Sequence, residues 1–233
     1  MKDWNKLGGG ASLIAAATFI FGFVLFATAL ADFTTGDPTP AESVAFLVDN
    51  QGVLQLWNAV IYVLFGIVLI PLALALYHHL KAASPIPTQV ATVFALVWSG
   101  LVLATGMVAN IAIATVADLH DANPGQAEPV WSALESVQNG LGGGNEIVGG
   151  LWVVLISMAA LQAGALVRPM NYFGIVAGIA GIVTIVPVLE PVGAVFGIGL
   201  IIWFIWLGIV LIRHSSGPVD QQSAAGIEAA GGA

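Results

Sequence analysis

Residues 193–212 read GAVFGIGLIIWFIWLGIVLI, twenty positions without a charged side chain, and Arg213 follows directly. A helix rises about 1.5 Å per residue, so this stretch would be about 30 Å long, the thickness of the hydrocarbon core of a bilayer. In lipid the backbone must satisfy its own hydrogen bonds, which a helix does within one segment. The stretch therefore predicts a membrane-spanning helix.

Five more apolar stretches precede it. The six predicted spans are residues 8–31, 56–77, 88–117, 147–167, 172–189 and 193–212. Residues Leu189–Gly193 (Leu-Glu-Pro-Val-Gly) predict a tight turn, so the last two spans should form a hairpin. We expect an all-α polytopic membrane protein, with a six-transmembrane-helix bundle as its domain over residues 1–213 and a disordered cytoplasmic tail over residues 214–233.

The composition excludes most other classes of protein. Of 233 residues, 58% are hydrophobic and 8% are charged, with a mean hydropathy of +0.96, whereas soluble domains carry about 25% charged residues. A net charge of −8 with five Lys and Arg residues argues against a nucleic-acid partner. The absence of cysteine excludes disulfides, iron–sulfur clusters and thiolate nucleophiles.

The basic residues predict the orientation. With six spans, all five fall on one side of the membrane: Lys2, Lys6, Lys81, Arg168 and Arg213. Ten acidic residues and no basic residue fall on the other side. The positive-inside rule then places both termini in the cytoplasm, and an odd number of spans would break this pattern.

The first span has a second interpretation. Ala29-Leu30-Ala31 before Asp32 resembles a signal-peptide cleavage site. The apolar run is longer than a typical signal core, which favours a helix that is not cleaved, and cleavage stays an open alternative.

Two outer segments predict short amphipathic helices. Thr39–Glu42 (Thr-Pro-Ala-Glu) has the cap, the proline and the glutamate of a helix start, and an apolar stripe of Val44, Leu47 and Val48 follows. Pro129–Leu141 has apolar residues at helical spacing, with Trp131 suited to a bilayer surface. We expect both extracytoplasmic helices to lie over the outer ends of the bundle, either covering them or roofing a pocket.

Small residues predict close helix packing. Lipid gives helices no hydrophobic reason to associate, so glycine and alanine must let their backbones approach. The four-residue pairs are Gly174 and Gly178, Ala177 and Gly181, and Gly193 and Gly197, and Gly149-Gly150 has a similar role.

The middle of each predicted span contains no ionisable residue. Its polar residues are Ser99, Thr105, Ser157 and Thr184. This argues against a proton-coupled pump, a charged-ion channel and a voltage sensor. No histidine is placed to ligate a haem within the bundle, and we expect no cofactor.

Counting residues from the inner end of each predicted span indicates that several polar residues lie in one layer at the outer boundary of the membrane. Asn58 precedes Lys81 by 23 residues, Glu146 precedes Arg168 by 22 and Glu190 precedes Arg213 by 23. At the rise of a helix, each would lie about 33 Å from the basic residue at the inner end of its span. The same layer includes Asn110 and Asn145, and Gln138 and Asn139 reach it from the second amphipathic helix.

This layer has two interpretations. It is either the membrane edge, where helices become polar and cap their ends, or the floor of an outward-facing pocket. In the second case the ligand-binding residues are Asn58, Asn110, Asn145, Glu146, Gln138 and Glu190. A cation or a neutral polar molecule would suit it, because the outer face has no positive charge.

Other candidate sites are weaker. Gly140–Glu146 (Gly-Leu-Gly-Gly-Gly-Asn-Glu) is either a flexible joint or a cup of backbone amides beside Glu146. Asp118, His120 and Asp121 could supply metal ligands, but solvated loop residues are the commoner case and we predict no metal. No serine lies in a Gly-x-Ser-x-Gly motif, and we predict no catalytic residue.

The chain resembles a bacterial family of six-span integral membrane proteins catalogued as a domain of unknown function. The resemblance covers about residues 10–213 and rests on Leu56–Ala59 (Leu-Trp-Asn-Ala), Gly106–Asn110 (Gly-Met-Val-Ala-Asn), Gly142–Trp152 and Asn171–Gly174. It implies the six-helix fold and a prokaryotic cell (inner) membrane, and supplies no catalytic residue, substrate or cofactor.

Three functions are expected from these observations. The first is binding of a small apolar or weakly polar ligand, or a lipid, at the outer-leaflet boundary. The second is an accessory or structural subunit that docks on a larger membrane complex. The third is an intramembrane enzyme using Glu146. The partners expected are membrane lipids with either the ligand or the complex, and the oligomeric state stays open.

Overall fold

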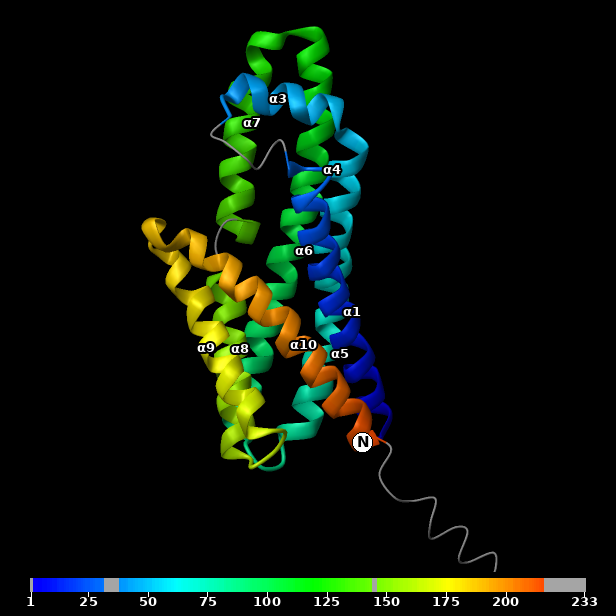
Figure 1. The fold of residues 1–233 in the computed structure, drawn as a ribbon, viewed down its shortest axis with the longest axis vertical. Coiled ribbons are helices and arrows are strands. Elements are labelled where there is room, and N and C mark those ends of the chain that lie inside the picture. Colours follow the sequence, from blue (N-terminus) through cyan, green and yellow to red (C-terminus); the bar gives the residue numbers. More distant parts are fainter. Residues whose placement is uncertain (1, 32–37, 144–145, 216–233) are drawn as a thin grey trace, which may run out of the picture.

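The computed structural model of the chain describes residues 2–31, 38–143 and 146–215. Within these ranges every regular element is a helix (Figure 1). Six helical stretches are long and apolar enough to cross a membrane: Lys2–Ala27, Gln51–Leu80, Pro85–Ala122, Pro124–Gln162, Arg168–Ile185 and Pro187–Ser215. The all-α, six-span prediction is confirmed.

The six spans form a closed ring, in which each helix packs on the next. Its members, in ring order, are α1 (Lys2–Ala27), α5 (Phe65–Leu80), α6 (Pro85–Ala122), α8 (Ile147–Gln162), α9 (Arg168–Ile182) and α10 (Gly193–Ser215), and α10 returns to α1. Buried hydroxyl groups join neighbours, as where Ser12 on α1 donates to the carbonyl of Phe204 on α10 at 2.7 Å. α10 extends two residues beyond Arg213, and the rest of the expected tail lies outside the described residues.

Aromatic side chains fill the centre of the ring. The indole rings of Trp98 and Trp152 have centroids 5.7 Å apart, and those of Trp152 and Trp203 are 5.6 Å apart. Phe65 packs edge-on against Trp98 at 5.0 Å. These rings come from four different helices, so their contacts fix how the helices sit around the core.

The predicted close packing of small residues is confirmed on α8 and α9. A Cβ added to Gly178 would lie 2.7 Å from the backbone oxygen of Gly150, and one added to Gly150 would overlap the backbone oxygen of Gly178. A Cβ added to Gly197 would lie 3.0 Å from the ring of Phe23, so this glycine also allows a close approach. Gly193 is different, because its nearest neighbour would be at an ordinary contact distance of 3.6 Å.

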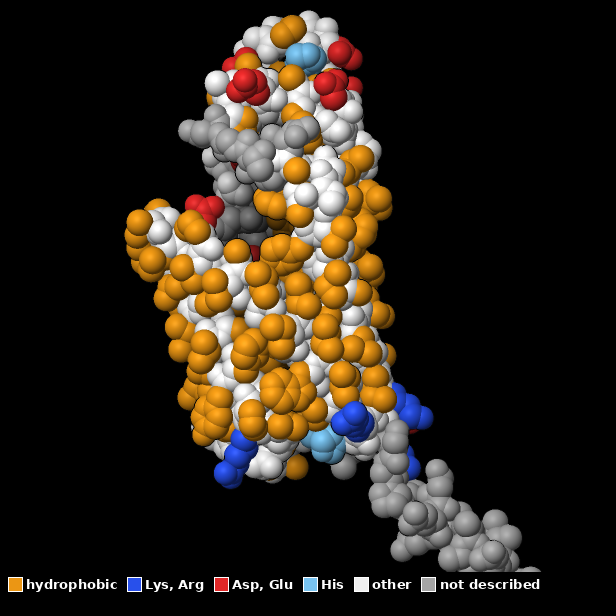
Figure 2. All heavy atoms as spheres, viewed as in Figure 1, with side chains coloured by type: hydrophobic (Ala, Val, Ile, Leu, Met, Phe, Trp, Pro, Cys, Tyr) orange, Lys and Arg blue, Asp and Glu red, His pale blue; other side chains and the backbone are white. Residues whose placement is uncertain are grey.

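The two ends of the bundle differ in charge. The ends where α1 begins, α5 ends, α9 begins and α10 ends lie together (Figure 1), so all five Lys and Arg residues belong to this end. Figure 2 shows basic side chains at this end and most acidic side chains toward the other. We call these the basic end and the acidic end. The charge separation agrees with the sequence prediction.

The two predicted outer helices are present at the acidic end of the bundle. α6 continues beyond the bundle to Ala122, and α7 (Pro124–Gln138) descends beside it as a hairpin, while α3 (Pro40–Asp49) crosses both (Figure 1). A second small core, around Val44, Leu47, Ile113, Val116 and Ala127, holds these helices together. Trp131 packs on this core, because the helix pair offers it apolar surface away from lipid.

The predicted start of α3 is confirmed. The hydroxyl of Thr39 accepts a hydrogen bond from the backbone N–H of Glu42 at 3.3 Å, and the backbone N–H of Thr39 donates to the Glu42 carboxylate at 2.8 Å. The second bond, together with a hydrogen bond from the Thr39 hydroxyl, holds the pKa of Glu42 below its ordinary value of 4.5.

We expect the start of α3 to loosen in acid. A carboxylate whose pKa is lowered by folding stabilises the fold above its unfolded pKa, and this stabilisation is lost as the pH falls through the folded pKa. Hydrogen exchange at the Thr39 amide, relative to a mid-helix amide of α3, should therefore rise between neutral pH and about pH 3. Glu42→Gln should remove this pH dependence, and equal relative exchange at both pH values in the wild type would contradict the prediction.

The second span contains a wider helical turn that the sequence did not predict. α4 (Gln51–Asn58) passes into a π-helical segment, Ala59–Leu64, before α5. Gly106 on α6 faces this segment, and a Cβ there would lie 2.8 Å from Cβ of Tyr62. π-helical turns often mark functional sites. Here the turn buries Tyr62 at the acidic end of the bundle.

The connection between α9 and α10 is longer than the tight turn predicted. α9 ends at Ile182, and two 3₁₀ turns, Val183–Ile185 and Pro187–Val192, follow before α10. Pro187 and Pro191 favour this path because a proline cannot continue an α-helix hydrogen-bond ladder. The hairpin itself is present, because α9 packs on α10.

Candidate functional site

A cavity of about 400 Å³ lies at the acidic end, between α1 and the start of α10. Nearer the basic end these two helices touch, since a Cβ on Gly208 would lie 3.0 Å from the backbone oxygen of Gly9. They diverge toward the acidic end, where the α9–α10 connection leans away from α1 (Figure 1). Figure 2 shows a hollow in the surface at this place.

Aromatic side chains line most of this larger cavity. They come from α1, the second span and α6, and are Phe19, Phe23, Phe26, Trp57, Tyr62, Phe65 and Trp98. Trp57 is fixed in place, because its indole N–H donates to the carbonyl of Gly22 on α1 at 3.1 Å. The wall is therefore held by a bond between two spans.

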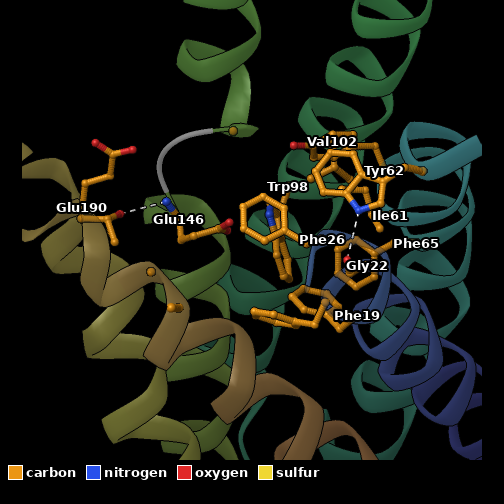
Figure 3. A pocket seen from close by; sticks show the side chains of 16 residues that line it. Phe19, Gly22, Phe26, Ile61, Tyr62, Phe65, Trp98, Val102, Glu146 and Glu190 are labelled. Carbon is orange, nitrogen blue, oxygen red and sulfur yellow. Dashed lines mark hydrogen bonds between the residues drawn. The ribbon is translucent and has the colours of Figure 1, made fainter. Parts of the chain in front are cut away.

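Glu146 supplies the carboxylate that faces these rings. Its backbone N–H donates to the hydroxyl of Thr184 at 2.9 Å, and that hydroxyl donates to the carbonyl of Gly181 at 2.7 Å. The start of α8 is thus tied to the end of α9. Figure 3 shows the Glu146 side chain pointing toward the aromatic rings of the opposite wall, whereas the side chain of Glu190 points away from them.

The Glu146 carboxylate has no charge partner within the described residues. No hydrogen bond from a described donor reaches its oxygens. The five Lys and Arg residues of the chain belong to the basic end, at the opposite ends of these helices. The cavity therefore has a carboxyl group without a charge partner from the described residues, among apolar and aromatic walls.

A smaller cavity of about 160 Å³ lies beyond the first, between the second span, α6 and α7. Its polar lining residues are Asn58, Glu135, Gln138 and Asn139. Trp57 and Tyr62 line both cavities, so their rings form the wall between them. Gln138 lies within hydrogen-bonding reach of the Tyr62 hydroxyl.

The family model described as Domain of unknown function (DUF4386) matches residues 7–213. The chain belongs to the DUF4386 family. No curated protein and no solved structure matches it. The match covers the whole helix bundle of this DUF4386 domain, and the description of the family assigns no activity to it.

In this DUF4386 domain, the residues predicted to share one outer layer do not all lie together. Glu146 and Glu190 line the larger cavity, and Asn58 and Gln138 line the smaller one. Asn110 lines neither, and its side-chain oxygen is buried without a hydrogen-bond partner from the described part of the chain. Asn145 lies outside the described residues. That these residues bind a ligand stays a prediction.

The distance predicted between Glu146 and the inner end of its span is too great. α8 has 16 residues and is therefore about 24 Å long, less than the 33 Å or so expected from residue counting. The difference arises because residues 163–167 are not helical. Gly164 and Leu166 have positive φ angles of 61° and 60° and turn the chain there. Thr184, expected in mid-span, lies beside Glu146 at the same level.

The aromatic wall was missed from the sequence. Phe19, Phe23 and Phe26 follow one another at helical spacing and so share one face of α1. That spacing was a usable signal for an aromatic surface.

The metal site considered at Asp118, His120 and Asp121 also gains no support, because no group of three or more His, Asp or Glu residues in the described part of the chain could hold a metal ion.

Gly142 bears on the choice between a joint and an amide cup. It has a φ of 130°, where the regular helix after α7 ends, and glycine adopts this conformation without strain. Gly142 also lines the larger cavity. The bend is required to bring the chain from α7 to Glu146, which favours the joint.

Proposed function

We propose that this membrane protein binds one small amphiphilic or apolar molecule in the larger cavity. The observation that carries the proposal is the cavity itself. Its volume of about 400 Å³ falls within the range of about 300–1,000 Å³ usual for small-molecule sites. Such sites combine apolar and aromatic walls with a few polar groups, as Glu146 and its aromatic neighbours do here.

The charge distribution supports a position for this site in the membrane. We propose that the basic end faces the cytoplasm, following the positive-inside rule, so that both termini are cytoplasmic in a prokaryotic cell membrane. Glu146, about 24 Å along α8 from its basic end, would then lie in the outer half of a hydrocarbon core about 30 Å thick.

The surroundings of the cavity support entry from lipid. Its lining includes Phe23 and Phe26 on α1 and Gly193 and Ala194 on α10, which border the gap between the two helices. The α9–α10 connection beside it carries apolar side chains turned outward, with Val188 81% exposed. Apolar surface of this kind is stable against lipid, so the ligand would enter sideways from the outer leaflet.

The alternative functions gain less support. An accessory subunit needs no internal cavity, and a filled bundle would suit it better. An enzyme using Glu146 needs a second reactive group beside the carboxylate. The hydroxyl of Thr184, which accepts from the backbone N–H of Glu146, already donates to the carbonyl of Gly181.

Tryptophan fluorescence tests the proposal. Bromine quenches tryptophan at contact, so ω-bromooctyl maltoside, an uncharged amphiphile, should quench Trp57 and Trp98 on binding to protein in nanodiscs of zwitterionic lipid. We expect quenching that saturates. Replacing both residues with phenylalanine should abolish the saturable component, whereas Trp206→Phe should preserve it, because Trp206 does not line the cavity. Quenching that only rises linearly with the probe, as for partition into bulk lipid, would contradict the proposal.

A further inference from the structure

We propose that the larger cavity selects an organic cation, an amphiphile whose head group is an amine or a quaternary ammonium. This inference rests on the proposed function, because it names the class of molecule that the cavity would bind. It is carried by the position of the Glu146 carboxylate opposite aromatic faces, and by the charges around it.

The first argument is the charge balance of the cavity. Among the described residues, its lining contains two carboxyl groups, those of Glu146 and Glu190, and no Lys, Arg or His. The basic side chains belong to the other end of the bundle. Low-dielectric walls strengthen the field of a charge that they enclose. The cavity should therefore attract a cation and repel an anion.

The second argument is geometric. The Glu146 side chain points across the cavity toward aromatic rings, among which Phe26 and Trp98 are labelled in Figure 3. A head group between the carboxylate and these rings would meet a counter-charge on one side and negative ring faces on the other. Cations bind over the faces of tryptophan, tyrosine and phenylalanine, and aromatic cages of this type recognise quaternary ammonium groups.

The third argument is the state of Glu146 without a ligand. No described donor reaches its carboxylate oxygens, and an ionised carboxylate among apolar walls is costly unless it is paired. A bound ammonium group would supply that pair and so favour the ionised form. A neutral ligand would supply neither a counter-charge for the carboxylate nor a cation for the ring faces.

Three probes that share one chain test this inference. They are ω-bromooctyl trimethylammonium, ω-bromooctyl maltoside and ω-bromooctyl sulfate, each titrated by tryptophan quenching in zwitterionic nanodiscs and compared at equal concentration in the lipid. We expect the trimethylammonium probe to bind at least about tenfold more tightly than the maltoside. The sulfate should show no saturable quenching.

Glu146→Gln should remove this preference by weakening the trimethylammonium probe about tenfold while leaving the maltoside nearly unchanged. The matched control is Glu128→Gln, which removes the same charge from an exposed position on α7 outside both cavities. It should bind all three probes as the wild type does.

The outcomes separate the two proposals. Equal binding of the cationic and neutral probes to the wild type would overturn the cation inference and leave ligand binding standing. Tighter binding of the sulfate would also overturn it. Absence of saturable quenching by all three probes would overturn both proposals. The wild-type preference is decisive on its own if Glu146→Gln fails to fold.

Discussion

Replacing Gly178 with leucine is expected to prevent assembly of a stable bundle. Gly178 on α9 faces Gly150 on α8 with backbone against backbone, and even a Cβ at Gly178 would lie 2.7 Å from the backbone oxygen of Gly150. A backbone oxygen cannot rotate away as the end of a side chain can. Overpacking a core costs about 1–3 kcal/mol and sometimes more, and four added carbons at this contact should exceed about 3 kcal/mol.

Gly100→Leu is the matched control. Gly100 also lies within a span, on α6, but it is exposed and nothing lies within 4 Å of a Cβ placed there. The added side chain would face lipid, and leucine favours a helix more than glycine does. Thermal unfolding followed by circular dichroism in nanodiscs should show a sharp loss for Gly178→Leu and none for Gly100→Leu. Equal midpoints would mean that α8 and α9 do not approach closely.

The sequence predicts close packing at these glycines, although not which glycine meets which, because the physics behind it is local. Small residues four apart lie on one face of a helix, and in lipid such a face has few uses other than close packing. The six spans and the separation of charges are predicted for similar reasons. Hydrophobic length and the position of each Lys or Arg are read directly from consecutive residues.

The outer helices show where this local reasoning fails. Continued apolar residues on α6, such as Ile113 and Val116, pack on Leu47 and Ala127 from separate segments. An amphipathic stripe tells only that a helix covers apolar surface. It does not tell whether that surface is lipid or another helix, so the sequence did not predict that α7 packs beside α6.

The candidate site was predicted only in part, because residue counting assumes uniform helices. The π-helical segment at Ala59–Leu64 changes the rotation of the second span and brings Tyr62 between Asn58 and Glu146. The turn at residues 163–167 lowers Glu146 relative to the expected layer. Glu146 and Glu190 still line one cavity, because Glu146 directly precedes α8 and Glu190 lies in the 3₁₀ turn before α10.

Ala194→Phe is expected to weaken binding of the uncharged bromooctyl probe at least about tenfold while the bundle stays folded. Ala194 lies in the first turn of α10, is exposed, and lines the larger cavity beside the gap between α1 and α10. A phenyl ring there would fill the part of the cavity beside this gap and so exclude part of the ligand. Filling a cavity commonly raises stability by about 0.5–2 kcal/mol, so lost binding would not reflect unfolding.

Val195→Phe tests whether the position of the ring, rather than its presence, is responsible. Val195 is the next residue, is 61% exposed, and does not line the cavity, so its phenyl ring would extend into lipid. Its saturable quenching should match that of the wild type, and both variants should unfold no earlier than the wild type. If Ala194→Phe binds the probe as tightly as Val195→Phe does, the ligand does not occupy the part of the larger cavity that lies beside the gap between α1 and α10.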